Sequence, residues 1–389
     1  MLQHHKTNRT TRGLIVTVLS LAALTAQAQP TSPVNGQLWP DADGQHINAH
    51  GGNIIRHEGT WYWYGEHRPV RGFSMDAGVA AYSSSDLIHW KNEGVVLSVS
   101  HEPGSDIESG CIMERPKVIY NKKTKKFVML FHLELKGQGY AAARVAFAVS
   151  DSPTGPFRFI RSTRLHAGKW PFDMNRKAIE AARQTNPSAW KEWWTPEWRR
   201  EVEKGMYLWQ DFEKGQMSRD MTVYVDDDGH AYHITSSQEN LTLLVSELTD
   251  DYLDFTGRYN MIAPGGQNEA PCIFKRGKDY WLICSGCTGW APNEARMFHS
   301  RSIWGPWQQL PSPFVGTATG YQDMPANKTF GAQGTYILPL GDQWMFMADI
   351  WNPRRLAQSL HLWLPIQFDD KGTPVIKWVD VPPIPSSLP

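Results

Sequence analysis

The sequence predicts an all-β fold, a five-bladed β-propeller with one helical insertion, and three observations support this prediction. Four segments of the 389-residue chain share one layout, in which a polar residue opens a β-rich run, a turn follows, and an aromatic-rich strand comes next. A fifth segment follows this layout more loosely. Further strand-like stretches come after most of these pairs, which gives about four strands per repeat. Repeats at a spacing of roughly 50–60 residues favour propeller blades over a solenoid.

The five repeats begin with polar residues at equivalent places. Their sequences are HGGNIIRHEGTWYWYG (50–65), ERPKVIYNKKTKKFVMLF (114–131), DMTVYVDDDGHAYHI (220–234), EAPCIFKRGKDYWLI (269–283) and QGTYILPLGDQWMFM (333–347). The first strand of each blade lines the central channel of a propeller, so equivalent residues lie at one height around its axis. We therefore expect Glu114, Asp220, Glu269 and Gln333 to form a ring.

Three carboxylates in one ring indicate catalysis. Clustered like charges repel and shift one another's pKa, so they do not favour stability. Any one of them could instead cap a turn or pair with Arg115 or Arg219. Acids at the equivalent position of three repeats, however, provide the divergent environments that acid–base chemistry needs.

Glycoside hydrolysis uses such a carboxylate pair, one on each side of the scissile bond. Glu269 is the best candidate for the general acid, because the NEAP context surrounds it with small and apolar residues and burial raises a carboxyl pKa. Asp220, beside Arg219, is expected to stay ionised and to raise the pKa of the acid.

The segments ERPKVIYN, SRDMTVYVDDDG, NEAPCIFK and SGCTGW resemble those of glycoside hydrolase family 43, in particular its galactan-active branch. The resemblance runs from about Leu38 to the end of the chain. It implies an exo-acting, inverting hydrolase that releases galactose from β-1,3-linked galactan or related β-galactosides. Glu269 matches the general acid of the family, Asp220 the residue that tunes it, and Glu114 a carboxylate that engages sugar hydroxyls. By the same similarity, further substrate contacts are expected at Glu66, Tyr140, Glu239 and Thr288.

The sequence departs from ordinary family members at the catalytic base. Those members carry an Asp at the start of blade one, where this chain has His50, Gly51 and Gly52. The galactan-active branch resembles this chain in that absence, and a Gln of blade five is held there to position the water. Gln333 matches that residue. Either Gln333 relays a proton through its imidic acid form, or Glu114 or His50 acts as the base.

An insertion of about 165–216 separates blades two and three. Helix-like stretches at 173–183 and 189–204 are broken by Asn186-Pro187 and Thr195-Pro196. The insertion holds six of the 18 tryptophans. It is either a self-packed helical hairpin or a wall or lid of the sugar pocket.

Composition and the N-terminus predict an exported protein. Lys and Arg number 39, as do Asp and Glu, so the chain lacks the basic surface that nucleic acid or an anionic membrane requires. Residues 1–28 resemble a signal peptide, with a basic start, an apolar run at 13–24 and a cleavage site after Ala28. We expect residues 29–389 to form one secreted or periplasmic domain, a monomer that acts on an oligo- or polysaccharide.

No cofactor or metal is expected. Cys284 and Cys287 form a C-x-x-C pair without a second pair at ligand spacing, which favours a structural role that includes a disulfide. The DDDG run at 226–229 suits a strand turn better than a calcium loop. Two alternative functions stay open, namely an α-L-arabinofuranosidase or β-xylosidase of the same family, and an inactive propeller that binds carbohydrate.

Overall fold

The computed structural model describes residue 1 and residues 33–68 and 78–385. The predicted signal peptide and its cleavage site lie outside the described residues, apart from Met1. Within the described ranges, no helix is both long and apolar enough to cross a membrane.

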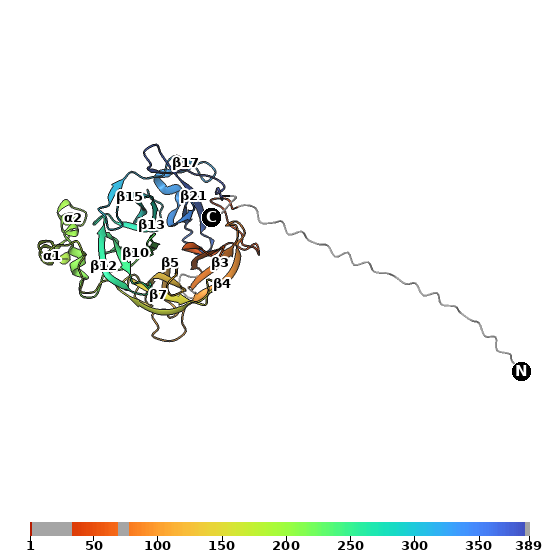
Figure 1. The fold of residues 1–389 in the computed structure, drawn as a ribbon, viewed down its shortest axis with the longest axis horizontal. Helices are drawn as coiled ribbons and strands as arrows, with labels where there is room; N and C mark the ends of the chain where they lie inside the picture. The colour runs from red at the N-terminus through yellow and green to blue at the C-terminus, as the bar shows by residue number, and fades with distance from the viewer. Residues whose placement is uncertain (2–32, 69–77, 386–389) are drawn as a thin grey trace.

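Five four-stranded antiparallel sheets surround a central axis, as the sequence predicts (Figure 1). Blade one is β1 (His50–His57), β2 (Thr60–His67), β3 (Gly78–Ser84) and β4 (Lys91–Ser98). Blade two is β5 (Ile112–Asn121), β6 (Lys126–Glu134), β7 (Arg144–Ser150) and β8 (Arg158–Thr163). Blade three is β9 (Met221–Val225), β10 (Ala231–Ser237), β11 (Thr242–Leu248) and β12 (Phe255–Ile262). Blade four is β13 (Asn268–Arg276), β14 (Asp279–Gly286), β15 (Arg296–Ser300) and β16 (Gln308–Leu310). Blade five is β19 (Gln333–Leu340), β20 (Gln343–Ile350), β21 (Leu360–Phe368) and β22 (Pro374–Ile376).

The core is divided among the joints between blades. Each first strand packs beside the first strand of the next blade, and β1 packs beside β19, which closes the ring. Five apolar clusters lie between successive sheets. Alternating strand residues face the two neighbouring blades, so both faces of each sheet are buried and the strands are rich in apolar side chains.

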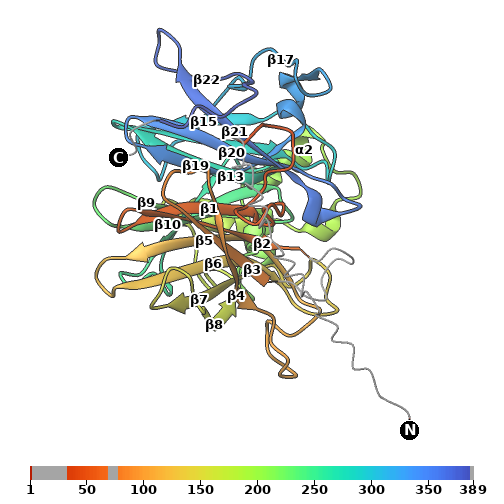
Figure 2. The same cartoon turned by 90° about the vertical axis from the view of Figure 1, so that its right-hand side faces the viewer.

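The joint between blades one and five closes the ring without a shared sheet. Residues 33–49 run along blade five, where Asn35 Nδ2 donates to the carbonyl oxygen of Trp363 at 2.8 Å and Asn35 Oδ1 accepts from its N–H at 2.8 Å. The Trp39 ring lies 5.1 Å from that of Trp363 and 6.2 Å from that of Trp63. Figure 2 looks onto this joint, with β1 of blade one next to β19 of blade five.

A local distortion of the backbone follows the opening residue in three of the blades. The register between first and second strands shifts directly after His50, Glu114 and Glu269, which marks a β-bulge in each blade. The residue that follows each opener has a positive φ, 62° at Gly51, 54° at Arg115 and 50° at Ala270. Because the same bulge and the same positive φ follow the opener in three blades, His50 is the blade-one equivalent of the acidic openers Glu114 and Glu269.

The insertion is helical and lies at the rim of the ring (green in Figure 1). It holds α1 (Arg176–Arg183), η1 (Pro187–Ala189), α2 (Pro196–Glu203) and α3 (Met206–Gln210). The predicted breaks are confirmed, because Asn186 and Thr195 are N-caps whose side chains accept from backbone N–H groups. Leu165 and Gln216 form a β-bridge at its base, so the insertion leaves and rejoins the propeller at one place.

Short elements complete the chain after blade four. Strands β17 (Thr317–Ala318) and β18 (Met324–Pro325) form a small separate sheet, followed by η2 (Ala326–Gly331). A last turn, η3 (Leu356–Gln358), connects β20 to β21.

Candidate active site

A cavity of about 360 Å³ lies where the first strands begin. It brings together all four predicted ring residues, Glu114, Asp220, Glu269 and Gln333. Its other lining residues include two of the predicted substrate contacts, and the full set is Glu66, Arg68, Arg115, His132, Tyr140, Arg219, Asn240, Gly289, Trp290 and Trp351.

Glu269 is the carboxyl group best suited to act as an acid. Burial, and next the charge of Asp220, raise the pKa of Glu269 to about 7. Asn240 Nδ2 donates to Glu269 Oε1 at 2.8 Å, and the thiol of Cys287 is in hydrogen-bond contact with the same carboxyl group. Glu269 can therefore hold a proton near neutral pH and release it during a reaction.

Asp220 forms an ion pair and a backbone hydrogen bond next to Glu269. Its Oδ2 atom lies 2.9 Å from Arg115 Nη2 and accepts a hydrogen bond of 3.1 Å from the backbone N–H of Ala270. Ala270 directly follows Glu269 in the chain, so this bond fixes the two carboxylates relative to each other. The two groups have different partners, as the two roles of a catalytic pair require.

Arg115 connects three of the predicted site residues. Its Nη2 atom contacts Asp220 and also donates to Gln333 Oε1 at 2.5 Å, and its backbone N–H donates to Glu66 Oε1 at 2.8 Å. From the sequence alone, Arg115 is expected only as a pairing partner of an acidic opener. The signal that could have identified it is its place directly after an opener, where the bulge gives the side chain a separate direction from that of Glu114.

Three donor groups surround the carboxylate of Glu114. Tyr140 donates to Glu114 Oε1 at 2.9 Å, His132 Nδ1 lies 3.2 Å from Oε2, and Arg68 Nη2 lies 3.5 Å from Oε1. Burial alone would raise the pKa of Glu114, but His132, Arg68 and Tyr140 lower it to about 2. Such a carboxylate is a weak base at neutral pH, and it is well suited to accept hydrogen bonds from sugar hydroxyls.

The partner histidine of Glu114 carries a positive charge. Burial would lower the pKa of His132, but the carboxylates of Glu114 and Glu134 raise it to about 9. His132 Nε2 lies 2.8 Å from Glu134 Oε1. The Glu134–His132–Glu114 chain therefore keeps Glu114 ionised, with His132 in the cavity wall and the buried Glu134 behind it.

Glu66 lies deeper than the other carboxylates. It is buried, forms an ion pair with Arg68, and accepts from Arg68 Nε at 2.8 Å. Burial raises the pKa of Glu66 against the opposing charge of Arg68. An added Cβ at Gly51 would clash with Glu66 Oε1, so glycine after the blade-one opener leaves room for this carboxylate.

Gln333 is fixed by hydrogen bonds at both ends of its amide. Its Oε1 atom accepts from Arg115 and, at 2.9 Å, from Trp351 Nε1, and its Nε2 atom donates to Ser285 Oγ at 3.0 Å. Among the described residues, Ser285 is the acceptor recorded for this Nε2 atom, which leaves its second N–H for a ligand. A water held by Gln333 would therefore accept a hydrogen bond from it.

His50 lies behind the cavity and is fully buried. Its Nδ1 atom lies 3.3 Å from Asp349 Oδ1, which is also 3.0 Å from His361 Nδ1. Burial would raise the pKa of Asp349, but the hydrogen bonds from His361 and His50 lower it far below its usual range. Gly51 N–H donates to the other oxygen of Asp349 at 2.6 Å. The buried carboxylate that contacts the His50 side chain thus comes from blade five and is already bound by three donors.

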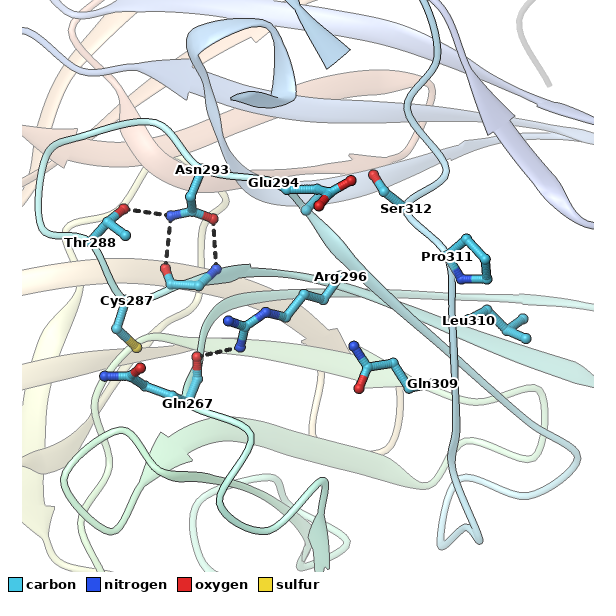
Figure 3. A pocket seen from close by; sticks show the side chains of 12 residues that line it. Gln267, Cys287, Thr288, Asn293, Glu294, Arg296, Gln309, Leu310, Pro311 and Ser312 are labelled. Atoms are coloured by element: carbon cyan, nitrogen blue, oxygen red, sulfur yellow. Dashed lines mark hydrogen bonds between the residues drawn. The ribbon is translucent and has the colours of Figure 1, made fainter. Parts of the chain in front are cut away.

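Glu239 and Thr288 do not line the cavity. Glu239 forms an ion pair with Arg219, which does line the cavity; Arg219 Nη2 lies 3.0 Å from Glu239 Oε2. Thr288 is exposed and lies on the wall of a neighbouring cavity of about 430 Å³ (Figure 3). Its hydroxyl accepts from Asn293 Nδ2 at 2.7 Å and donates to the carbonyl oxygen of Ala291 at 2.5 Å. Their roles in substrate binding stay predictions.

The cysteines are all free thiols. Cys284 is buried in β14, so the structure does not pair it with Cys287 in the disulfide that the sequence allowed. Cys287 instead lies between the cavity of Figure 3, which it lines, and the carboxyl group of Glu269. The strand direction explains the difference, because Cys284 faces the core while the chain after Gly286 has already left the sheet.

In the part of the chain that the structure describes, two groups of side chains have the spacing to hold a metal ion, and most of their polar atoms are engaged within the protein. One is Glu114, His132 and Asp220, and the other is His46, His50 and His361. In the first group, the guanidinium groups of Arg68 and Arg115 contact the carboxylates of Glu114 and Asp220. Their positive charge opposes the binding of a further cation. The second is engaged with Asp349 and with backbone carbonyl oxygens.

A strained turn borders the acid. Gln238, Glu239 and Asn240, between β10 and β11, have φ values of 53°, 56° and 63°. The left-handed conformation costs a non-glycine residue about 1–2 kcal/mol. Sequence reasoning did not find Asn240, because QEN carries no glycine and its conformation depends on contacts that the sequence does not display.

Comparisons with known proteins agree with this geometry. The model of glycosyl hydrolases family 43 matches residues 166–374. Among solved structures, a family 43 β-1,3-galactosidase with bound galactodeoxynojirimycin is 58% identical, with 90% of this chain and 99% of that chain covered and a TM-score of 0.85. An exo-β-1,3-galactanase from Clostridium thermocellum is 33% identical, with 90% and 66% covered and a TM-score of 0.70. An exo-β-1,3-galactanase from Phanerochaete chrysosporium, solved with β-1,3-galactotriose, is 29% identical, with 90% and 68% covered and a TM-score of 0.70. The comparison with curated proteins found no match.

Proposed function

Since this chain belongs to glycosyl hydrolase family 43, we propose that it is an exo-acting, inverting hydrolase that releases galactose from β-1,3-linked galactan or related β-galactosides. The similar structures named for this activity share its fold over 90% of the chain. Glu269 is the general acid of the proposed reaction and Asp220 is the anion that raises its pKa.

The observation that carries this proposal is the contrast between the two neighbouring carboxyl groups. Glu269 has a pKa raised to about 7 by burial and by Asp220, while an arginine and a backbone N–H hold Asp220. A glycosidase needs one protonated carboxyl group to protonate the leaving oxygen. In an inactive propeller that only binds carbohydrate, the repulsion between Glu269 and Asp220 would reduce stability without serving a function.

The remaining cavity residues suit a terminal sugar. Glu114 and Glu66 are acceptors for hydroxyl groups, and the rings of Trp290 and Trp351, 5.6 Å apart, offer apolar faces for the C–H side of the sugar. The cavity, about 360 Å³, is near the lower end of the ~300–1,000 Å³ range of ligand pockets, which suits recognition of a chain end. In this proposal Gln333 holds the attacking water through its free N–H.

Product analysis tests the proposal. The purified protein should release galactose alone from β-1,3-galactan, and should cleave aryl β-galactosides faster than aryl α-L-arabinofuranosides or β-xylosides. If the protein instead cleaved the arabinofuranosides or xylosides faster, it would be an α-L-arabinofuranosidase or a β-xylosidase of the same family. Binding to galactan without product, by a folded protein, would leave only the carbohydrate-binding function.

The site of action is a separate part of the proposal. We propose that the protein is exported after cleavage behind Ala28 and acts as a monomer on polysaccharide outside the cytoplasm. N-terminal sequencing of the protein from its natural host should then begin at Gln29, and light scattering should give the mass of one chain. An intact N-terminus would reject the proposal for export without affecting the proposed activity.

A further inference from the structure

The turn between β10 and β11 combines backbone strain with a direct contact to the general acid. Gln238, Glu239 and Asn240 are consecutive left-handed residues without a glycine. Non-glycine residues in this conformation persist where surrounding contacts impose it, and they concentrate at functional sites. The turn therefore needs an explanation in terms of what it places in the cavity.

The strained turn directs the Asn240 amide at one oxygen of Glu269. Asn240 Nδ2 donates to Glu269 Oε1 at 2.8 Å, and the Ser236 hydroxyl lies 3.1 Å from Asn240 Oδ1. Ser236 is fully buried, and its single hydroxyl proton is shared between Asn240 Oδ1 and, at 2.7 Å, the carbonyl oxygen of Asn268, the residue directly before Glu269. The asparagine side chain is thus tied at its other end to the strand that carries the acid.

We propose that Asn240 is a positioning residue for the general acid, because its hydrogen bond to Oε1 leaves Oε2 to carry the proton and to face the glycosidic oxygen. The inference rests on the proposed function. In the reaction the proton passes from Oε2 to the leaving oxygen, which takes the electron pair of the breaking bond to the anomeric carbon. A water oxygen forms the new bond to that carbon and its proton is lost to solvent. The carboxylate that remains keeps the hydrogen bond from Asn240, which stabilises its new charge.

The helical insertion holds the turn in place. Leu241, directly after Asn240, is buried in a cluster with Trp198 and Val202 of α2 and Met206 and Tyr207 of α3. The carbonyl oxygen of Leu241 also accepts from the backbone N–H of Gln267 at 3.1 Å, just before β13. These contacts supply the constraint that a left-handed asparagine requires. The insertion therefore acts on the acid through Leu241 and Asn240.

Asn240→Gly tests the proposal, because glycine adopts the left-handed conformation without strain and deletes only the amide. We expect kcat/KM to fall roughly 10–100-fold on a galactoside with a poor leaving group, as for a misplaced catalytic group. With a dinitrophenyl galactoside, which needs little protonation, we expect a change of about threefold or less. The alkaline limb of the pH profile should move to higher pH, since the lost donor stabilised the ionised form of Glu269.

Two further variants keep the result interpretable. Asn240→Asp preserves the shape and replaces the donor by an acceptor, so it should shift the alkaline limb upward even if the glycine variant is unstable. Lys125→Gly is the matched control, since Lys125 is exposed and left-handed, with a φ of 56°, on the distant β5–β6 turn. It should leave both substrates and the pH profile unchanged.

Two results would overturn the positioning role. An equal loss on both aryl galactosides would assign Asn240 to substrate binding. If the alkaline limb of the pH profile moved in neither Asn240 variant, Asn240 would not affect the ionisation of Glu269. Failure of the proposed function is distinguishable from either, because the wild-type protein would then cleave neither galactoside.

Discussion

The Nη2 atom of Arg115 lies 2.5 Å from the Oε1 atom of Gln333 and donates to it. Trp351 Nε1 donates to the same oxygen at 2.9 Å, so both lone pairs of the amide oxygen are occupied. The imidic acid form would place a hydroxyl proton against these two donors. The resting site therefore favours the ordinary amide, and in the proposed reaction Gln333 would hold the water by donating to it.

Replacement of Gln333 by alanine should remove most of the activity and leave the fold intact. The side chain contributes hydrogen bonds to the cavity wall and little apolar area to the core, so thermal unfolding should change little. The measurement is kcat/KM on an aryl β-galactoside together with the melting temperature. Azide or formate should restore little activity, because these anions replace a lost carboxylate base and the lost group is an amide.

His50→Ala should reduce activity less than Gln333→Ala. His50 is fully buried and contacts Asp349, so its loss should appear mainly as reduced stability. Both variants are compared at a temperature where each is folded. If His50→Ala were the more damaging change, and Gln333→Ala kept over about a tenth of the wild-type rate, a loss below 1.4 kcal/mol, the water-positioning role would belong to blade one.

Glu269→Gln should lower kcat on substrates with poor leaving groups by on the order of 10²–10⁴-fold, the usual contribution of a general acid. The amide keeps the shape of the side chain and lacks the transferable proton. Activity on a dinitrophenyl galactoside should fall much less. Near-normal turnover of a β-1,3-linked disaccharide by this variant would reject Glu269 as the acid.

The raised pKa of Glu269 predicts a pH-dependent cost in stability. A carboxyl group whose pKa is higher in the folded state binds more protons when folded, so stability falls as pH rises from its unfolded pKa through about 7. Activity should fall across the upper part of the same window, because the acid loses its proton. Glu269→Gln should therefore be more stable than wild type at pH 8, by on the order of 2 kcal/mol, and similar to it near pH 4.

Urea unfolding at the two pH values measures this difference. Glu294→Gln is a suitable control, because Glu294 is an exposed carboxylate on the neighbouring cavity and outside the catalytic one. Its stability relative to wild type should be the same at both pH values. A Glu269→Gln variant that gained no stability at pH 8 would show that Glu269 ionises without penalty in the fold.

Hydrolysis should invert the anomeric configuration. In an inverting enzyme the acid and the water-activating group are roughly 6.5–9.5 Å apart, which leaves room for the water, and residues of different blades facing across a channel suit that separation. Proton NMR of the first product from a β-linked galactoside should show α-galactose. Initial release of β-galactose would require a covalent intermediate and a different role for Asp220.

The sequence predicts the ring because its signal repeats. Each opener precedes a β-branched and aromatic strand, and equivalent positions in a propeller face one channel, so Glu114, Asp220, Glu269 and Gln333 meet in one cavity. The helix breaks of the insertion follow from local residues in the same way, since Asn186 and Thr195 cap the elements that follow them.

Other parts of the site depend on contacts between distant segments. Arg115 reaches Gln333 across 218 positions of the chain, and Asn240 reaches Glu269 across 29. Their directions are set by a bulge and by a left-handed turn, neither of which requires a characteristic residue type. The unpaired state of Cys284 and Cys287 is likewise decided by where the strand ends.

The closure of the ring has a consequence for local unfolding. The joint between blades one and five connects sheets from opposite ends of the chain, and the contacts of Asn35 and Trp39 hold it. Thermal opening at this joint separates β1 from β19 without disturbing the continuous run from blade two to blade four. Amide protons near the joint should then exchange with solvent earlier than those around the acid pair. The proposed water site at Gln333, at the start of β19, is accordingly the part of the proposed catalytic machinery that depends most on the two ends of the chain remaining together.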